Sequence, residues 1–123
     1  MVDELKKEKT ARKKRYKART ELREEIKEDL LEQLQERNIF ESHYVDLVND
    51  YLALWDIKNE LIYDIETKGV SVKYQNGANQ WGYKKNDSVR ELTTVNNQML
   101  KILNDLGLKP TSVVVEDDDN FEL

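Results

Sequence analysis

The stretch from Asn86 to Pro110 most constrains the fold, because both of its ends carry residues that start or stop a helix. Ser88 and Glu91 have the spacing of a capping box, in which each side chain binds a backbone N–H that the first turn leaves unpaired. Gly107 suits the left-handed residue that follows a helix, and Pro110 prevents its continuation. Hydrophobic residues recur between these ends at steps of three and four: Val89, Leu92, Val95, Met99, Leu103 and Leu106. The sequence therefore predicts a helix over residues 88 to 106.

Two further helices are predicted upstream. Leu22, Ile26, Leu30 and Leu34 lie four apart and form a stripe that ends near Asn38. A longer helix is expected from Ser42, which can cap its start, to Lys68-Gly69, which ends it. Its hydrophobic residues mark one broad face: Tyr44, Leu47, Val48, Tyr51, Trp55, Leu61, Ile62 and Ile65. Residues 1 to 19 have almost no apolar stripe, so they are expected to form a partly frayed arm rather than a core element.

A short β-hairpin is predicted between the last two helices, at about residues 70 to 84. Val70, Val72 and Tyr74 alternate with polar residues before the turn signal Asn76-Gly77, and Trp81 and Tyr83 alternate beyond it. The loop is expected to run from residue 75 to residue 80. Because an isolated hairpin is marginally stable in water, Trp81 or Val72 is expected to pack on the helices or on another subunit.

Charge is segregated along the chain. Residues 1 to 20 carry nine Lys and Arg against three Asp and Glu, whereas residues 21 to 66 carry four against fourteen. Such a cluster of cations favours contact with phosphates, and the predicted DNA-binding residues of the arm are Lys6, Lys7, Lys9, Arg12, Lys13, Lys14, Arg15, Lys17 and Arg19. Lys84, Lys85 and Arg90 form a second, smaller basic cluster. The alternative is a solubilising terminus that pairs with the acidic stretch behind it.

The composition favours an oligomer. Hydrophobic residues make up 38% of the 123 residues and charged residues 37%, which is little apolar material for a monomer of this size. Long amphipathic helices bury more surface when their stripes meet neighbouring subunits. The residues expected at such contacts are Tyr51, Leu54, Trp55, Leu61, Ile62, Leu92, Met99 and Leu103. The chain has no cysteine and no apolar run long enough to span a membrane, which fits a reducing cytoplasm and no membrane partner.

No motif predicts catalysis, a cofactor or a metal site. Residues 77 to 82 have the glycine spacing of a phosphate-binding loop, but Tyr83-Lys84 follows where Lys and then Ser or Thr are needed. His43 has no cysteine partner and lies at a predicted helix start, where a surface role is expected. The consecutive acids at 116 to 119 point in divergent directions and suit a solvated or partner-binding tail better than a metal site. Neither an aromatic platform for single strands nor a helix-turn-helix is recognisable.

Several blocks in order resemble the small terminase subunits of tailed bacteriophages. They are Tyr51-Leu52-Ala53-Leu54-Trp55, Lys84-Lys85-Asn86-Asp87-Ser88 and the run from Gln98 to Pro110, so that the likeness covers roughly residues 44 to 110. The resemblance implies a non-enzymatic, ring-forming protein of the host cytoplasm that binds double-stranded viral DNA and recruits the large, ATP-hydrolysing terminase subunit. The segment expected to recruit that subunit is the acidic tail, with Glu116, Asp117, Asp118, Asp119 and Phe121.

Together these observations predict a mainly α fold of long antiparallel helices with a short β-hairpin, assembling into a homo-oligomeric ring. Residues 1–20 are expected to form the basic arm, 21–110 the helical oligomerisation core with the hairpin, and 111–123 the acidic tail. Two other interpretations remain. One is an all-helical oligomeric adaptor or regulator that binds no DNA, and the other is a small helical enzyme, which the absence of a nucleophile and base pair disfavours.

Overall fold

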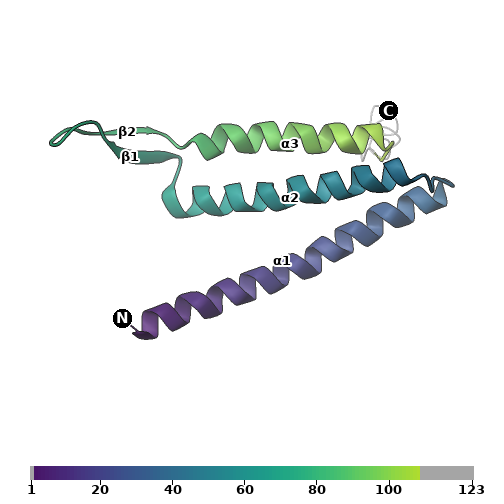
Figure 1. The fold of residues 1–123 in the computed structure, drawn as a ribbon, viewed down its shortest axis with the longest axis horizontal. Coiled ribbons are helices and arrows are strands. Elements are labelled where there is room, and N and C mark those ends of the chain that lie inside the picture. Colours follow the sequence, from purple (N-terminus) through teal and green to yellow (C-terminus); the bar gives the residue numbers. More distant parts are fainter. Residues whose placement is uncertain (1, 109–123) are drawn as a thin grey trace, which may run out of the picture. The chain divides into compact units, whose positions relative to one another are not determined.

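The computed structural model describes residues 2–108, which form three helices and one two-stranded antiparallel sheet (Figure 1). The elements follow in the order α1 (Val2–Glu36), α2 (Ser42–Lys68), β1 (Ser71–Gln75), β2 (Trp81–Lys85) and α3 (Asp87–Asp105). The mainly helical class and the hairpin are therefore as predicted. None of the helices in the described range is long and apolar enough to cross a membrane.

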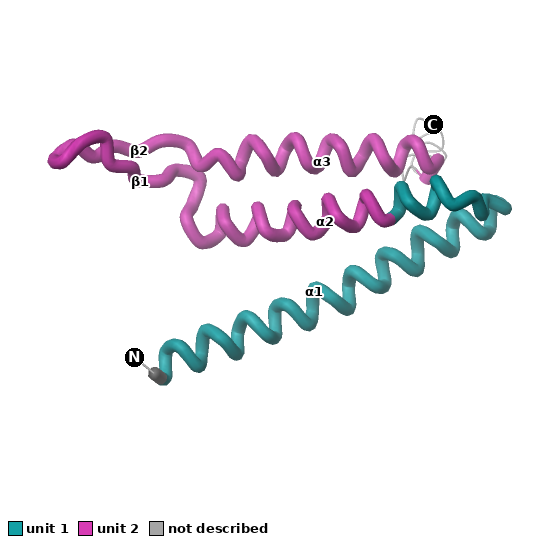
Figure 2. The backbone as a smooth tube through the Cα atoms, viewed as in Figure 1, with its two compact units in different colours: residues 1–48 teal, residues 49–123 magenta. Residues whose placement is uncertain are grey.

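The chain divides into two compact units, residues 1–48 and residues 49–123 (Figure 2). The buried hydrophobic side chains of the first unit are Leu30, Leu34 and Val48. Those of the second unit are Leu52, Trp55, Met99, Leu106 and Leu108. In the second unit α3 runs back along α2, and the hairpin extends beyond the ends of the two helices that it joins (Figure 1).

The first helix is longer than its apolar stripe. A frayed arm was expected before residue 20, but α1 continues without interruption from Val2 to Glu36. The first glycine of the chain is Gly69 and its only proline is Pro110, so nothing in this stretch breaks a helix. Lys, Arg, Glu and Ala, which dominate it, are strong helix formers. The arm is therefore helical, although residues 3–18 are all exposed.

The hairpin pairs residues 71–75 with residues 81–85, so that Lys73 lies opposite Tyr83 and Tyr74 opposite Gly82. The strand positions and the loop agree with the sequence pattern. Either Trp81 or Val72 was expected to pack, and within the chain Val72 is half-buried, whereas Trp81 is 59% exposed. On the same face as Val72, the ring of Tyr74 covers Gly82, since a Cβ built on Gly82 would lie 3.0 Å from Cε1 of Tyr74.

The start of α3 differs from the capping box that was expected. The N-cap is Asn86, whose side-chain oxygen accepts a hydrogen bond from the backbone N–H of Ser88 at 3.1 Å. Ser88 lies inside the first turn, and its hydroxyl donates to Asp64 on α2 at 2.7 Å. The Ser88 hydroxyl, which the sequence pattern predicted to cap α3, thus binds an ionised carboxylate on the neighbouring helix instead.

Candidate functional site

The nine cations of the arm lie on α1, and all except Arg19, which is half-buried, are exposed. Because an α-helix turns by about 100° per residue, the consecutive Lys13, Lys14 and Arg15 point in three directions. Cations therefore lie around the helix instead of along one face. Such an arm can place charge near phosphates on several sides, but it offers no shaped surface for reading bases.

The second basic cluster lies around the base of the hairpin. Lys84 and Lys85 end β2, and Arg90 lies in the first turns of α3. The structure adds Lys68 and Lys73 to them, because both line a cleft of about 490 Å³ together with Lys84. A second cleft of about 530 Å³ is lined by Lys85, Asp87 and Arg90 and by the apolar side chains of Val70 and Val89.

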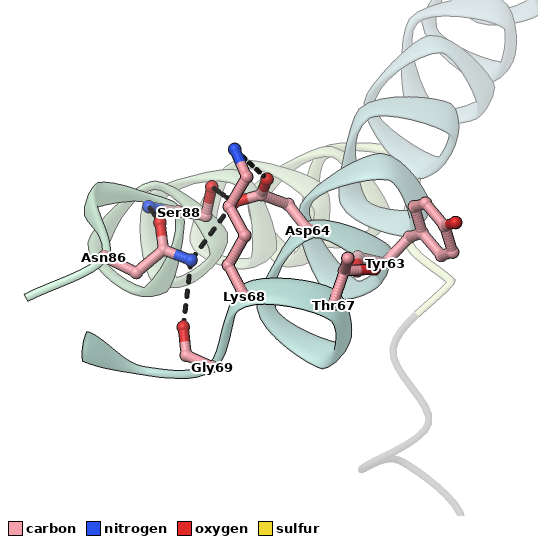
Figure 3. A network of polar contacts seen from close by, with 7 residues as sticks. All are labelled: Tyr63, Asp64, Thr67, Lys68, Gly69, Asn86 and Ser88. Atoms are coloured by element: carbon pink, nitrogen blue, oxygen red, sulfur yellow. Dashed lines mark hydrogen bonds and ion pairs between the residues drawn. The ribbon is translucent and has the colours of Figure 1, made fainter. Parts of the chain in front are cut away.

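A network of polar contacts fixes this base to α2 (Figure 3). Asn86 is 6% exposed, and its side-chain amide donates to the Asp64 carboxylate at 3.1 Å and to the Gly69 carbonyl at 3.0 Å. The Asn86 backbone N–H donates to the Val70 carbonyl at 2.8 Å. One buried side chain therefore joins the end of α2, the entry to the hairpin and the start of α3.

Asp64 is the acceptor at the centre of this network. Its carboxylate receives the Ser88 hydroxyl and the Asn86 amide, and the Lys68 ammonium lies 2.9 Å from its other oxygen. These contacts, the bond from Ser88 first among them, lower the pKa of Asp64 from 3.8 to about 2. Asp64 is therefore ionised at neutral pH and partly offsets the local positive charge. Its contacts with Ser88, Asn86 and Lys68 stabilise the hairpin base.

The hairpin carries a group of residues that the sequence analysis missed. Cross-strand partners share a face, so the register places Lys73, Trp81, Tyr83 and Lys85 on one face of the ribbon. All four are exposed, and the Lys73 ammonium lies 4.7 Å from the centre of the Trp81 ring. The period-two pattern predicted the strands, but only the pairing of residues 71–75 with 81–85 shows which lysines join the two aromatic rings.

The residues expected at subunit contacts divide into two groups by burial. Trp55 and Met99 are 7% and 3% exposed and are thus buried by the chain itself. The other six are half-buried: Tyr51, Leu54, Leu61, Ile62, Leu92 and Leu103. Burial raises the pKa of the Tyr51 hydroxyl. Trp55 and Met99 therefore stabilise the fold, and the half-buried group is what a neighbouring subunit could still cover.

The remaining candidates show no reactive arrangement. Gly77 has a φ of 109° in the hairpin loop, which is the turn role expected of it, and His43 is exposed at the start of α2. Within residues 2–108 no group of three or more His, Asp or Glu side chains is placed to hold a metal ion. The tail residues Glu116, Asp117, Asp118, Asp119 and Phe121 lie outside the described residues.

A family model described as phage terminase, small subunit, matches residues 24–114 of the chain. The match includes part of each unit, with the hairpin and its base, and leaves out the whole basic arm and the end of the tail. No curated protein and no solved structure matches the chain.

Proposed function

The chain belongs to the phage terminase small-subunit family, which serves the packaging of phage genomes, and we propose that within this role it binds double-stranded viral DNA and recruits the large terminase subunit. It acts in the infected host cell, as its family does. The observation that carries the DNA-binding part is the arm, which holds nine cations on one helix, eight of them exposed. The chain contributes no catalytic group to packaging.

The arm supplies most of the affinity for DNA, and the cluster of Lys84, Lys85 and Arg90 supplies a smaller share. Each phosphate that a cation neutralises releases a counterion, so binding weakens steeply with salt. If about five phosphates are contacted, the affinity falls roughly 500-fold between about 50 and 200 mM salt, because the logarithmic slope is about −0.9 per phosphate. The alternative is an adaptor whose arm only solubilises the protein, and this alternative predicts no such binding.

Removal of residues 1–19 tests this proposal. The truncated protein is expected to lose most duplex affinity in a fluorescence-anisotropy titration, since the removed segment carries all nine cations. A gentler variant replaces Lys13, Lys14 and Arg15 with Gln and is expected to flatten the salt slope by about one unit for each of these cations that contacts a phosphate. Lys101→Gln, an exposed cation on α3, is the matched control and keeps full affinity. If the truncated protein binds the duplex with full affinity, the DNA-binding site lies at the hairpin base and not on the arm.

The acidic tail is proposed to contact the large subunit through Glu116, Asp117, Asp118, Asp119 and Phe121. Its consecutive carboxylates complement the positive charge that a DNA-handling enzyme needs. Removal of residues 111–123 is expected to abolish stimulation of the large subunit's ATP hydrolysis while duplex binding persists. Unchanged stimulation by this variant would place the contact elsewhere on the chain.

We further propose that the subunits form a homo-oligomeric ring. The half-buried residues of α2 and α3 support this, because further burial of Leu54, Leu61 and Leu103 would stabilise an assembly. A ring also places several arms around one duplex, so that weak individual contacts become strong together.

A further inference from the structure

We infer that the exposed face of the hairpin, formed by Lys73, Trp81, Tyr83 and Lys85, binds single-stranded nucleic acid by stacking unpaired bases on its two aromatic rings. This inference rests on the proposed nucleic-acid role of the chain and goes beyond it, because that role needs only contacts with a duplex backbone. The face is formed by residues of the hairpin and by none of the basic arm, which belongs to α1.

The first argument is that two aromatic side chains of the hairpin are exposed to solvent. Trp81 is 59% and Tyr83 74% exposed, although both are large aromatic residues that usually bury most of their surface. They are two residues apart on β2, so their side chains leave the same face about 7 Å apart. The opposite face differs, since Val72 and Gly82 there are half-buried and the Tyr74 ring covers Gly82. One face of the hairpin thus leaves both aromatic rings exposed to solvent, with the Lys73 ammonium over the Trp81 ring.

The second argument is charge. The chain has no carboxylate between Glu66 and Asp87, whereas the same stretch contains Lys68, Lys73, Lys84 and Lys85. On the exposed face the Lys73 ammonium lies 4.7 Å from the centre of the Trp81 ring, and Lys73 is the cross-strand partner of Tyr83. Lys85 lies on the same face, two residues after Tyr83. Aromatic rings beside lysines complement a single-stranded nucleic acid, because its bases can stack on the rings and its phosphates carry negative charge.

The third argument is continuity with the cleft at the hairpin base. Lys85 belongs both to the exposed face and to the lining of the 530 Å³ cleft, which its cross-strand partner Ser71 also lines and which continues to Arg90 on α3. This cleft is lined by two cations, Lys85 and Arg90, and one carboxylate, Asp87, so its charge still favours the phosphates of a strand whose bases stack on Trp81 and Tyr83. The bases of a duplex are stacked on one another and offer no free face to these rings, so the geometry favours unpaired bases.

The test uses the full-length protein and two labelled probes, a thymidine oligonucleotide of about 20 nucleotides and a duplex of the same length. Trp81→Leu and Tyr83→Leu keep an apolar side chain but remove the flat ring. Each is expected to weaken binding of the oligonucleotide about 5- to 150-fold while duplex affinity stays within about twofold. Two matched controls keep both affinities: Tyr74→Leu on the opposite face of the hairpin, and Phe40→Leu, which is 65% exposed and far from it in sequence.

Tryptophan fluorescence gives a second readout. The chain has two tryptophans, of which Trp55 is 7% and Trp81 59% exposed. The oligonucleotide is expected to quench the wild-type emission, and the quenching is expected to disappear in Trp81→Phe, which still binds because it keeps a flat ring. Circular dichroism of each variant shows whether it is folded.

Several results would overturn the inference. They are full oligonucleotide affinity in Trp81→Leu and Tyr83→Leu, an equal loss in Tyr74→Leu, or no binding of the oligonucleotide by a protein that binds the duplex. A change of oligomer mass in Trp81→Leu with unchanged oligonucleotide affinity would make this face a subunit contact instead. These outcomes differ from failure of the proposed function, in which the wild-type protein binds neither probe.

Discussion

Asn86 shows how a single buried amide can hold three elements together. It is the only buried polar residue among those described, and its side chain meets α2, the hairpin entry and the first turn of α3. The sequence pattern placed the cap two residues later because Ser88 and Glu91 have capping-box spacing. That pattern is local, whereas the partner that takes the Ser88 hydroxyl, Asp64, is 24 residues away.

The cap can be tested by comparing Asn86→Ala with Ser88→Ala. The first change removes the N-cap oxygen and leaves the Gly69 carbonyl without its side-chain donor, so a loss of about 2 kcal/mol is expected. The second removes one hydroxyl contact and is expected to cost about 1 kcal/mol. Urea unfolding measures both. A larger effect of Ser88→Ala than of Asn86→Ala would restore Ser88 as the cap.

Asp64 makes stability depend on pH in a defined direction. Its pKa is about 2 in the folded chain and 3.8 ordinarily, so its ionised form stabilises the folded state above about pH 4. This contribution is expected to fade as the pH falls from about 5 to 2, the pKa of the folded state. Asp64→Asn removes it. The difference between the urea midpoints of the wild type and Asp64→Asn is therefore expected to be full at pH 6 and to shrink through that window, and a constant difference would contradict the assignment.

At the scale of elements, helix ends explain which boundaries the sequence predicts well. The second helix was expected from Ser42 to Lys68 and lies there, because Gly69 follows with a φ of 84° and donates to the Ile65 carbonyl. The length of α1 was missed, because its first half lacks an apolar stripe and periodicity was the signal used. Helix propensity without any breaker predicts that half better.

Two helices end in the same hydrogen-bond pattern with different residues in the left-handed position. Asn38 follows α1 with a φ of 60°, and Ile39 donates to the Leu34 carbonyl. Gly107 follows α3 with a φ of 73°, and Leu108 donates to the Leu103 carbonyl. Both are Schellman motifs, in which glycine avoids the contact that a Cβ makes with the backbone.

Exchanges at these two positions are therefore expected to act in opposite directions. Asn38→Gly should raise stability by roughly 0.5 kcal/mol, because glycine adopts the left-handed conformation without a Cβ clash. Gly107→Ala should lower it by about 1 kcal/mol for the converse reason. Thermal melts of the two variants measure the signs. Destabilisation by Asn38→Gly would mean that the Asn38 side chain contributes more than its backbone conformation costs.

At the scale of the whole molecule, the described chain has a thin core. Eight hydrophobic side chains of the described part are buried, whereas thirteen large ones are exposed. The sequence predicted this imbalance from composition, and it predicted the basic arm from charge order. It missed the aromatic face of the hairpin, because the grouping of Lys73 with Trp81 and Tyr83 depends on strand pairing, and a count of aromatics along the chain does not show it.

Substitutions of buried residues and of half-buried residues are expected to have different effects. Trp55→Ala removes a buried ring and is expected to cost about 3–5 kcal/mol of folding stability at any protein concentration. Leu54→Gln and Leu61→Gln change half-buried residues, and they are expected to lower the oligomer mass in size-exclusion chromatography with light scattering while the helical signal persists. A wild-type protein that is monomeric at tens of micromolar contradicts the assembly.

The assembly and the arm are expected to be coupled through avidity. A Leu61→Gln variant that dissociates keeps every cation of the arm, so each subunit retains its own contact with phosphates. It nevertheless presents one arm instead of several, and the effective concentration of neighbouring arms is lost. Duplex affinity is therefore expected to fall about 100-fold or more, with a shallower salt slope, because fewer phosphates are neutralised at once. Anisotropy titrations at several salt concentrations measure both quantities. Unchanged affinity and slope in a dissociated variant would show that one arm binds the duplex alone.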